Sequence, residues 1–402
     1  MLRRSFIAGG AGLIAAAALH ARAEETPGVT ASAIKIGNTM PYSGPLSSFA
    51  AIGRAEAAVF KMVNEQGGID GRKIDFISLD DAYSPPKTVE QIRKLVEEDN
   101  VAFIFNSLGT PPNTAIEKYL NDRKIPQLFV ATGADKWGNY KQFPWTIGYQ
   151  PSYRIEARIY AKYILQHKPD AKLGFLYQND DFGKDYLLGV KDVLGDKFDK
   201  MVASSVSYEA TDPTVDSQIV SLQSAGADTL IAAAGPKPAA QAIRKVYDIG
   251  WKPLFFLSNV SVSVAAVIKP AGVEKAVGVV TAYWGKDPTD PAWNDDPGMK
   301  QWRAFMAKYL PDADQTDVNY VYGYGVALLM VHVLQQCGND LSRANIMRQA
   351  TNLHDLEGPL LLPGMRINTS PTNYHPIQQM QLARWNGKTW ERFGELIEGS
   401  GV

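Results

Sequence analysis

The sequence has a single cysteine, few histidines and none of the common catalytic motifs, and each absence excludes a class of site. Cys337 has no partner for an internal disulfide, and no pair of cysteines is available for a zinc or redox centre. The five histidines are scattered, and neither Gly-x-Ser-x-Gly nor His-Glu-x-x-His occurs. The sequence therefore predicts no enzyme, no metal site and no cofactor.

The sequence also has no strong net charge of either sign, and it has no long apolar run after its N-terminal segment. The formal net charge is −1, which gives no basic surface for nucleic acid or anionic lipid. After residue 23, no stretch approaches the roughly 20 apolar residues that a membrane span requires. We therefore expect no nucleic-acid partner and no stable membrane insertion. Hydrophobic residues make up 45% of the 402 residues, which is enough material for two cores rather than one.

The N-terminus has the composition of a cleavable secretory signal. Residues 3 and 4 are arginines, residues 6–19 are mostly small or apolar, and residues 21–23 read Ala-Arg-Ala. This order predicts a signal peptide over residues 1–23 with cleavage after Ala23, and hence a periplasmic protein. Residues 3–7 also resemble a twin-arginine signal, so the export pathway stays open.

From residue 33 onward, short β-rich runs alternate with helical patterns. The first set, which begins with a strand, is 34–37, 49–65, 73–79, 86–98, 101–105, 110–123 and 126–131. The second set, which begins with a helix, is 154–166, 173–177, 183–194, 201–208, 215–225, 229–234, 239–249 and 254–257. Strands and helices in strict turn predict an α/β fold with two doubly wound parallel sheets. The segment 143–151 follows neither period and is typical of a crossover between the two units.

Two loops at the ends of predicted strands have the chemistry of a binding site. In open parallel sheets, ligands bind beyond the C-terminal ends of the strands. Residues 106–110 follow one strand and open a helix, where free backbone N–H groups and hydroxyls are available to a carboxylate. Residues 131–134 repeat this combination one strand further on. Either loop alone could be a simple helix cap, but two at neighbouring strand ends favour a carboxylate site.

Four motifs occur in order along the chain: Met-Pro-Tyr-Ser-Gly-Pro at 40–45, Asn-Glu-Gln-Gly-Gly-Ile-Asp-Gly-Arg-Lys-Ile at 64–74, Asp-Asp-Ala at 80–82 and Asn-Asp-Asp-Phe-Gly-Lys-Asp at 179–185. In this combination the chain resembles the leucine/isoleucine/valine-binding branch of the type I periplasmic binding proteins, from residue 33 to its last strands. The resemblance implies two Rossmann-like lobes joined by a three-segment hinge. It also implies a ligand in the cleft, a monomeric protein, and the permease subunits of an ABC importer as partners.

The resemblance also implies lobe limits and ligand-binding positions. Residues 33–149 and 281–358 would form the first lobe, and residues 150–280 and 359–398 the second. Carried over by position, with aromatic residues near the crossovers added, the ligand-binding residues would be Phe49, Ser107, Leu108, Gly109, Thr110, Ala131, Thr132, Gly133, Tyr149, Phe182, Gly235, Asn259 and Trp284.

One departure from the family pattern bears on the ligand. Amino-acid binders have an acidic side chain at the position of Asn259, because a buried ammonium without a counter-charge is unfavourable. Asn259 is neutral, and the chain offers the aromatic side chains of Phe49, Tyr149, Phe182 and Trp284. Together they indicate a slot for a small hydrophobic or aromatic carboxylate. We therefore expect an extracytoplasmic solute-binding protein of an ABC importer that captures such an acid.

Three alternatives stay open at this point. The same fold could bind a branched-chain amino acid or an amide, and Asp287 or Asp290 could then supply the missing counter-charge by folding over the cleft. The chain could also be the ligand-sensing subunit of a signalling receptor. Finally, Arg154 could pair with a ligand carboxylate or with an acid that joins the lobes.

Overall fold

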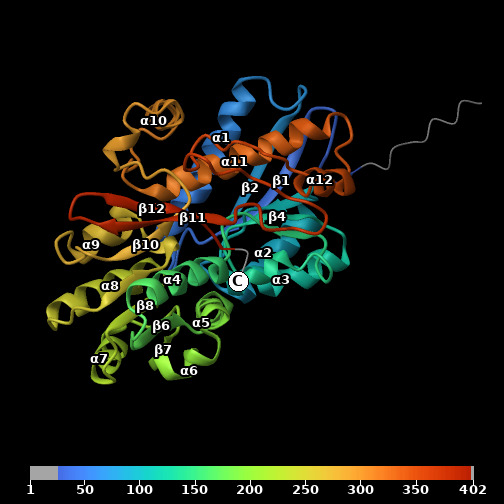
Figure 1. The fold of residues 1–402 in the computed structure, drawn as a ribbon. Helices are drawn as coiled ribbons and strands as arrows, with labels where there is room; N and C mark the ends of the chain where they lie inside the picture. The colour runs from blue at the N-terminus through green and yellow to red at the C-terminus, as the bar shows by residue number, and fades with distance from the viewer. Residues whose placement is uncertain (1–25, 400–402) are drawn as a thin grey trace, which may run out of the picture.

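The computed structural model describes residues 26–399, so the predicted signal peptide, residues 1–23, lies outside the described part of the chain. The chain builds two sheets, each flanked by helices (Figure 1). One has five strands in the order β2-β1-β3-β4-β5, and the other has seven in the order β12-β11-β10-β9-β8-β6-β7. This confirms the predicted fold class of two doubly wound α/β lobes.

The first sheet is parallel throughout and comes from the N-terminal part of the chain. Its strands are β1 (Ala33–Met40), β2 (Lys73–Asp80), β3 (Phe103–Phe105), β4 (Gln127–Val130) and β5 (Thr146–Gly148). The helices between them are α1 (Ala50–Glu65), α2 (Pro85–Arg93) and α3 (Thr110–Asp122), and three more follow much later in the chain: α10 (Pro297–Tyr309), α11 (Val318–Cys337) and α12 (Arg343–Ala350). The helix α11 is apolar on most faces because it packs between α1, α12 and the interior.

The second sheet is parallel from β6 to β10 and antiparallel at its C-terminal strands. Its strands are β6 (Leu173–Gln178), β7 (Val202–Tyr208), β8 (Thr229–Ala233), β9 (Leu254–Leu257), β10 (Val280–Tyr283), β11 (Gln379–Trp385) and β12 (Trp390–Glu398). Its helices are α4 (Tyr153–His167), α5 (Asp181–Leu194), α6 (Phe198–Met201), α7 (Asp216–Ser224), α8 (Pro236–Asp248) and α9 (Lys269–Ala271). The buried apolar strands β8 and β9 lie at its centre.

The chain passes between the two halves three times: after β5 at 149–152, after β10 at 284–296, and after α12 at 351–378. The prediction places residues 281–283 in the first lobe. In the structure they belong to β10, where Thr281 lies opposite Ala383 and Tyr283 opposite Gln381 of the second sheet. The buried run Val-Thr-Ala-Tyr is itself a strand of that sheet, so the second crossover begins after it.

Candidate ligand-binding site

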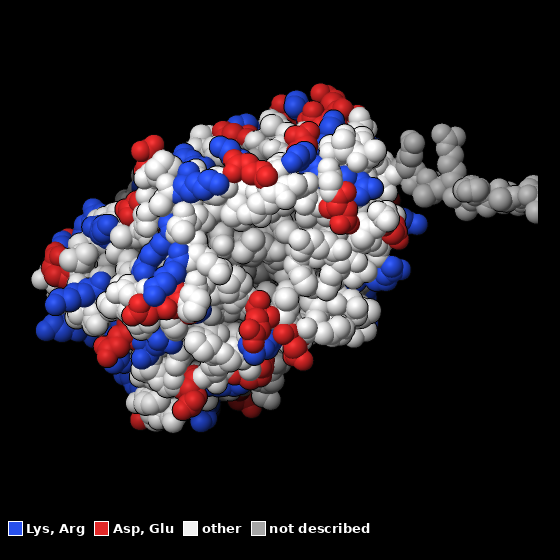
Figure 2. Space-filling model, turned by 90° about the horizontal axis from the view of Figure 1, so that it is seen from above, with Lys and Arg blue, Asp and Glu red and all other residues white. Residues whose placement is uncertain are grey.

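A cavity of about 270 Å³ lies between the two sheets. Its lining comes from both halves of the molecule and from all three crossovers, with Gln150, Trp284 and Leu360 as examples from each crossover. On the face seen in Figure 2, the molecule is hollowed near its middle, and the hollow is bordered largely by uncharged residues, with Lys, Arg, Asp and Glu spread around it. The volume is close to the lower end of the range for small-molecule sites.

Ten of the thirteen predicted site residues line this cavity. They are Phe49, Leu108, Gly109, Thr110, Ala131, Tyr149, Phe182, Gly235, Asn259 and Trp284. Residues around 108 and 131 follow β3 and β4, while Gly235 and Asn259 follow β8 and β9. The strand ends of the two sheets therefore face one another across the cavity, as the rule for open parallel sheets predicts.

The other three predicted residues, Ser107, Thr132 and Gly133, do not line the cavity and instead support its wall from behind. The Oγ of Ser107 accepts a hydrogen bond from the backbone N–H of Thr39, at 3.0 Å. The hydroxyl of Thr132 shares a 2.5 Å hydrogen bond with the hydroxyl of Thr110. A Cβ on Gly133 would lie 2.7 Å from the carbonyl oxygen of Pro151, so this glycine allows the first crossover to pass close by.

The sequence analysis predicted that the loops after β3 and β4 offer free backbone N–H groups to a carboxylate. This prediction is wrong for most of these N–H groups. Leu108 and Ala131 form a parallel β-bridge that extends the first sheet beyond β3 and β4. As a result the N–H groups of Leu108, Gly109 and Ala131 donate to backbone carbonyls. The first turn of α3 also contains Pro111 and Pro112, which have no N–H to donate.

A hydrogen-bonded chain that includes cavity-lining side chains joins the two halves. The Nε2 of Gln178, at the end of β6, donates to the hydroxyl of Tyr83 from the first half, at 3.2 Å. The Oε1 of Gln178 accepts from the hydroxyl of Tyr208 at 3.2 Å, and that hydroxyl accepts from the N–H of Gly235 at 2.9 Å. Tyr83 and Gln178 both line the cavity, and the sequence analysis missed both. Their contact holds the halves together over the cavity.

Gly109 is required where the ring of Tyr83 lies against the loop after β3. Its φ of +100° is in the region that favours glycine, and a Cβ at this position would lie 2.3 Å from the ring of Tyr83. Glycine at position 109 therefore allows this close approach of the Tyr83 ring.

Removing the Tyr83 hydroxyl should weaken ligand binding by favouring an open arrangement of the halves. For Tyr83→Phe we expect a dissociation constant about 3- to 10-fold higher, since a single neutral hydrogen bond contributes about 0.5–1.5 kcal/mol. Isothermal titration calorimetry measures this change. The matched control is Tyr42→Phe, whose hydroxyl bonds to Ser78 within the first half. An equal loss of affinity in both variants would contradict a specific role for the contact between the two halves.

Gln150 is a second residue that the sequence analysis missed. It lies in the first crossover, is only 7% exposed, and lines the cavity. Its Nε2 has no hydrogen-bond partner within the described chain. A buried amide donor without a partner is unfavourable. A ligand acceptor in the cavity would satisfy it.

Asn259 is held in place by a buried carboxylate, Glu156 of α4. The carboxylate of Glu156 accepts from the hydroxyls of Tyr160 and Tyr186, at 2.5 and 2.7 Å, and from the N–H and the Nδ2 of Asn259. Burial raises the pKa of Glu156 to about 7, against the opposing effect of these donors. One hydrogen of the Asn259 Nδ2 is used by Glu156, which leaves its second amide hydrogen and its Oδ1 outside this contact.

The cavity lining carries almost no charge. Among residues 26–399, no Lys or Arg lines it, and the acid that does, Glu357, is exposed and pairs with Arg366 at 2.6 Å. Asp287 is buried elsewhere, where it accepts from the hydroxyl of Tyr283 at 2.7 Å. Asp290 caps a short turn by accepting from Ala292. Neither aspartate lines the cavity, so the counter-charge considered for an amino-acid ligand is not in place.

Arg154 does not line the cavity either. Its guanidinium makes two hydrogen bonds to Asp192 of α5, at 2.6 and 2.7 Å, and lies 4.0 Å from Asp135 of the first half. Of the two alternatives for Arg154, the structure therefore supports pairing with acids.

Three buried carboxyl groups predict an unusual pH dependence of stability. Burial raises the pKa of Glu117, Glu156 and Asp185 to about 7 each, from ordinary values of 4.5, 4.5 and 3.8. Between the ordinary and the raised pKa values, the folded state binds more protons than the unfolded state. The free energy of unfolding therefore decreases as the pH rises through this range, and these groups stabilise the protein most at lower pH. We expect a higher urea midpoint at a pH of about 5.5 than at about 7.5. Asp185→Asn should flatten the difference, and a midpoint that falls steadily below pH 7 would contradict this assignment.

Comparison with known protein sequences places both halves of the fold in one family. The sequence profile of the family described as "Periplasmic binding protein" matches residues 33–389. A relative from Brucella abortus (strain 2308), "Leu/Ile/Val-binding protein homolog 7", is 24% identical over 389 residues, which cover 92% of this chain and 93% of the relative. Both sequence matches extend over both halves of the fold.

Two solved structures share this fold. A branched-chain amino acid ABC transporter protein from Thermus thermophilus with bound valine has a TM-score of 0.82 and 15% identity, covering 92% of this chain and 97% of its own. A fatty acid ABC transporter substrate-binding protein from Thermomonospora curvata has a TM-score of 0.77 and 23% identity, covering 93% and 95%. At these identities the likeness concerns the fold alone.

Proposed function

The chain belongs to the periplasmic binding protein family, and from this premise we propose that it captures a hydrophobic or aromatic carboxylate outside the cytoplasm and delivers it to an ABC importer. Members of this family bind solutes and are not enzymes. In this proposal residues 1–23 direct export to the periplasm, and the mature protein acts as a monomer on the permease subunits. Within residues 26–399, no helix has the length and apolar character to cross a bilayer.

The observation that carries the proposal is the apolar, nearly charge-free lining of the cavity. Tyr149, Trp284 and Tyr322 form an aromatic trio, with ring centroids 5.4–5.9 Å apart and planes at 81–86° to one another. Such edge-to-face rings offer flat apolar surface to a ligand. A cavity with these walls favours an apolar molecule over a zwitterion, because the described residues that line it include no buried acid to pair with an ammonium.

Neutral donors would receive the carboxylate of this ligand. The amide of Gln150 is available in the lining, and the Tyr83 hydroxyl lies in the same cavity. Hydrogen bonds to a charged acceptor are roughly twice as strong as neutral ones. We propose that Gln150 is the main contact of the carboxylate, in place of the backbone N–H groups of the loop after β3.

Closure of the two lobes is the proposed mechanism. We assign residues 33–149 and 284–358 to one lobe and residues 150–283 and 359–398 to the other. Contacts across the cleft, such as the 2.7 Å hydrogen bond from the Asp135 N–H to Asp185, favour the closed arrangement. A ligand that touches both lobes adds its binding energy only to that arrangement and so shifts the population toward it.

A branched-chain amino acid is the second candidate, because the Brucella relative is named for such ligands. A thermal-shift screen separates the two candidates, since a ligand that binds the folded state raises its melting midpoint by mass action. We expect hydrophobic and aromatic acids to raise the midpoint and leucine to leave it unchanged. If leucine raises it while no simple carboxylate does, the proposed ligand class is wrong.

A further inference from the structure

Part of the cavity is a space beside α11, which contributes lining residues from Val318 to His332. We call this space the α11 arm and define it by six lining residues: Val321, Gly325, Leu328, Leu329, Leu361 and Ile367. We propose that the α11 arm holds the hydrocarbon tail of a straight-chain monocarboxylic acid whose carboxylate lies in the cleft. The inference rests on the proposed function and narrows its ligand from hydrophobic acids in general to elongated ones.

The length of the α11 face that lines the cavity supports an elongated ligand. Residues of α11 that line the cavity run from Val318 to His332 and recur every three or four positions, so they form one face of the helix. At a rise of 1.5 Å per residue, this face extends for about 21 Å. A benzoate ring or a branched-chain amino acid fills only part of such a length, whereas an extended alkyl chain follows it.

The distribution of polar groups sets the direction of the ligand. Tyr83, Gln150, Gln178 and Asn259 belong to the cleft and its crossover, whereas the six residues that define the α11 arm carry no polar side chain, although the Tyr149 hydroxyl lies beside Gly325. At the far end of α11 the lining includes His332 and the exposed Glu357. The carboxylate therefore fits the cleft, and the methyl groups of the chain fit between leucines in the arm, where each buried methylene is favourable.

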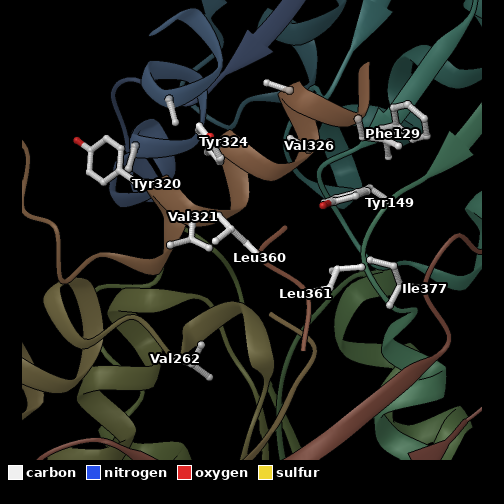
Figure 3. Packing of buried hydrophobic residues seen from close by; sticks show 14 of the residues in the cluster. Phe129, Tyr149, Val262, Tyr320, Val321, Tyr324, Val326, Leu360, Leu361 and Ile377 are labelled. Atoms are coloured by element: carbon white, nitrogen blue, oxygen red, sulfur yellow. The ribbon is translucent and has the colours of Figure 1, made fainter. Parts of the chain in front are cut away.

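The outer wall of the arm is preformed. Leu361 pairs with Gly285 in an antiparallel bridge, and the backbone N–H groups of Lys286 and Leu362 donate to the carbonyls of Leu360 and Trp284, at 2.8 and 3.1 Å. These bonds fix the third crossover to the second. In Figure 3, Leu360 and Leu361 lie below α11 and the Tyr149 hydroxyl points toward the helix.

Gly325 leaves room for the tail. Glycine is unfavourable inside a helix, yet α11 has two. At Gly323 a Cβ would meet the carbonyl oxygen of Ile52 at 2.5 Å, so that glycine allows α1 to pack closely. At Gly325 a Cβ would have only the Tyr149 hydroxyl nearby, at 3.4 Å. The missing side chain at Gly325 therefore adds space to the cavity.

Calorimetry with a homologous series of acids tests the inference on the exported protein. The probes are butanoate, hexanoate, octanoate, decanoate and dodecanoate, with benzoate and leucine for comparison. We expect affinity to rise about 3- to 4-fold per added methylene, which corresponds to about 0.8 kcal/mol, until the arm is full. In Gly325→Leu, decanoate binding should fall at least about 10-fold, and it should fall more than butanoate binding does.

Two further variants distinguish a loss of tail binding from a general effect of the substitution on folding. Gln335→Leu adds the same side chain at an exposed position of α11 and should change no affinity. Leu328→Phe narrows the arm from another position and should repeat the effect of Gly325→Leu. Both arm variants should melt at or near the wild-type midpoint.

The outcomes separate the inference from the proposed function. If acids bind but affinity does not depend on chain length, or if benzoate exceeds decanoate and Gly325→Leu has no effect, the tail assignment is wrong while the proposed function stands. If no carboxylate of any length binds, the proposed function itself fails, and the inference fails with it.

Discussion

Gln150→Glu is expected to weaken binding of the carboxylate ligand by at least about 100-fold. The substitution keeps the size of the side chain but places an acceptor, and at neutral pH a negative charge, where the buried Nε2 now lies. The lost charge-assisted hydrogen bond is worth about 1.5–3 kcal/mol, and repulsion between two buried carboxylates adds to it. Calorimetry with a bound hydrophobic acid measures the effect.

Two comparisons make this result specific. Gln150→Leu removes the donor without adding charge and should weaken binding less, by about 10-fold or more. Gln142→Glu makes the same charge change at an exposed position and should leave the affinity unchanged. Should Gln150→Glu instead create affinity for leucine, the residue would face an ammonium, and the choice of a simple carboxylate would be wrong.

Glu156→Leu is expected to lower the free energy of unfolding by about 3 kcal/mol or more. Glu156 is the acceptor for the backbone N–H and one amide hydrogen of Asn259 and for two tyrosine hydroxyls. Tyr160 and Tyr186 have other partners in Leu257 and Ser258, so the stranded donors are chiefly those of Asn259. Leaving buried donors without an acceptor costs about 1–3 kcal/mol for each group.

Urea denaturation measures this loss as a lower midpoint with an unchanged slope. The control is Glu90→Leu on α2, where the glutamate is exposed and the change should stay within about 0.5 kcal/mol. A Glu156→Leu protein as stable as the wild type would show that the four donors find other acceptors. Ligand binding by this variant should also weaken, because Asn259 would no longer be fixed at the cavity.

The sequence predicted the parts of the site that depend on the order of strands and helices. The loops at 108–110 and 131 follow from the rule that parallel strands end at one edge of their sheet, whereas Gly235 and Asn259 were predicted from the family resemblance. Periodicity could not reveal that Leu108 bridges to Ala131, because that pairing depends on the packing of two loops in three dimensions. The prediction of free N–H groups failed for this reason.

The sequence analysis missed several residues because their roles depend on the three-dimensional structure. Gln150 is in a crossover, which has no period, and its importance comes from burial without a partner. Glu156 is 103 positions away from the Asn259 that it holds. The helix α11 is apolar on most faces, so its pattern does not distinguish the face toward α1 from the face toward the cavity.

The strands β11 and β12 are the last in the chain but belong to the second sheet, and this order limits how the protein can be cut into fragments. The second sheet takes strands from residues 173–283 and again from 379–398, while α11, which covers the first sheet, lies between those stretches. No contiguous fragment therefore contains the whole of the second half without also carrying helices of the first. Neither half can be excised as one uninterrupted gene segment, and contacts between residues so distant in sequence favour slow, concerted folding of both halves.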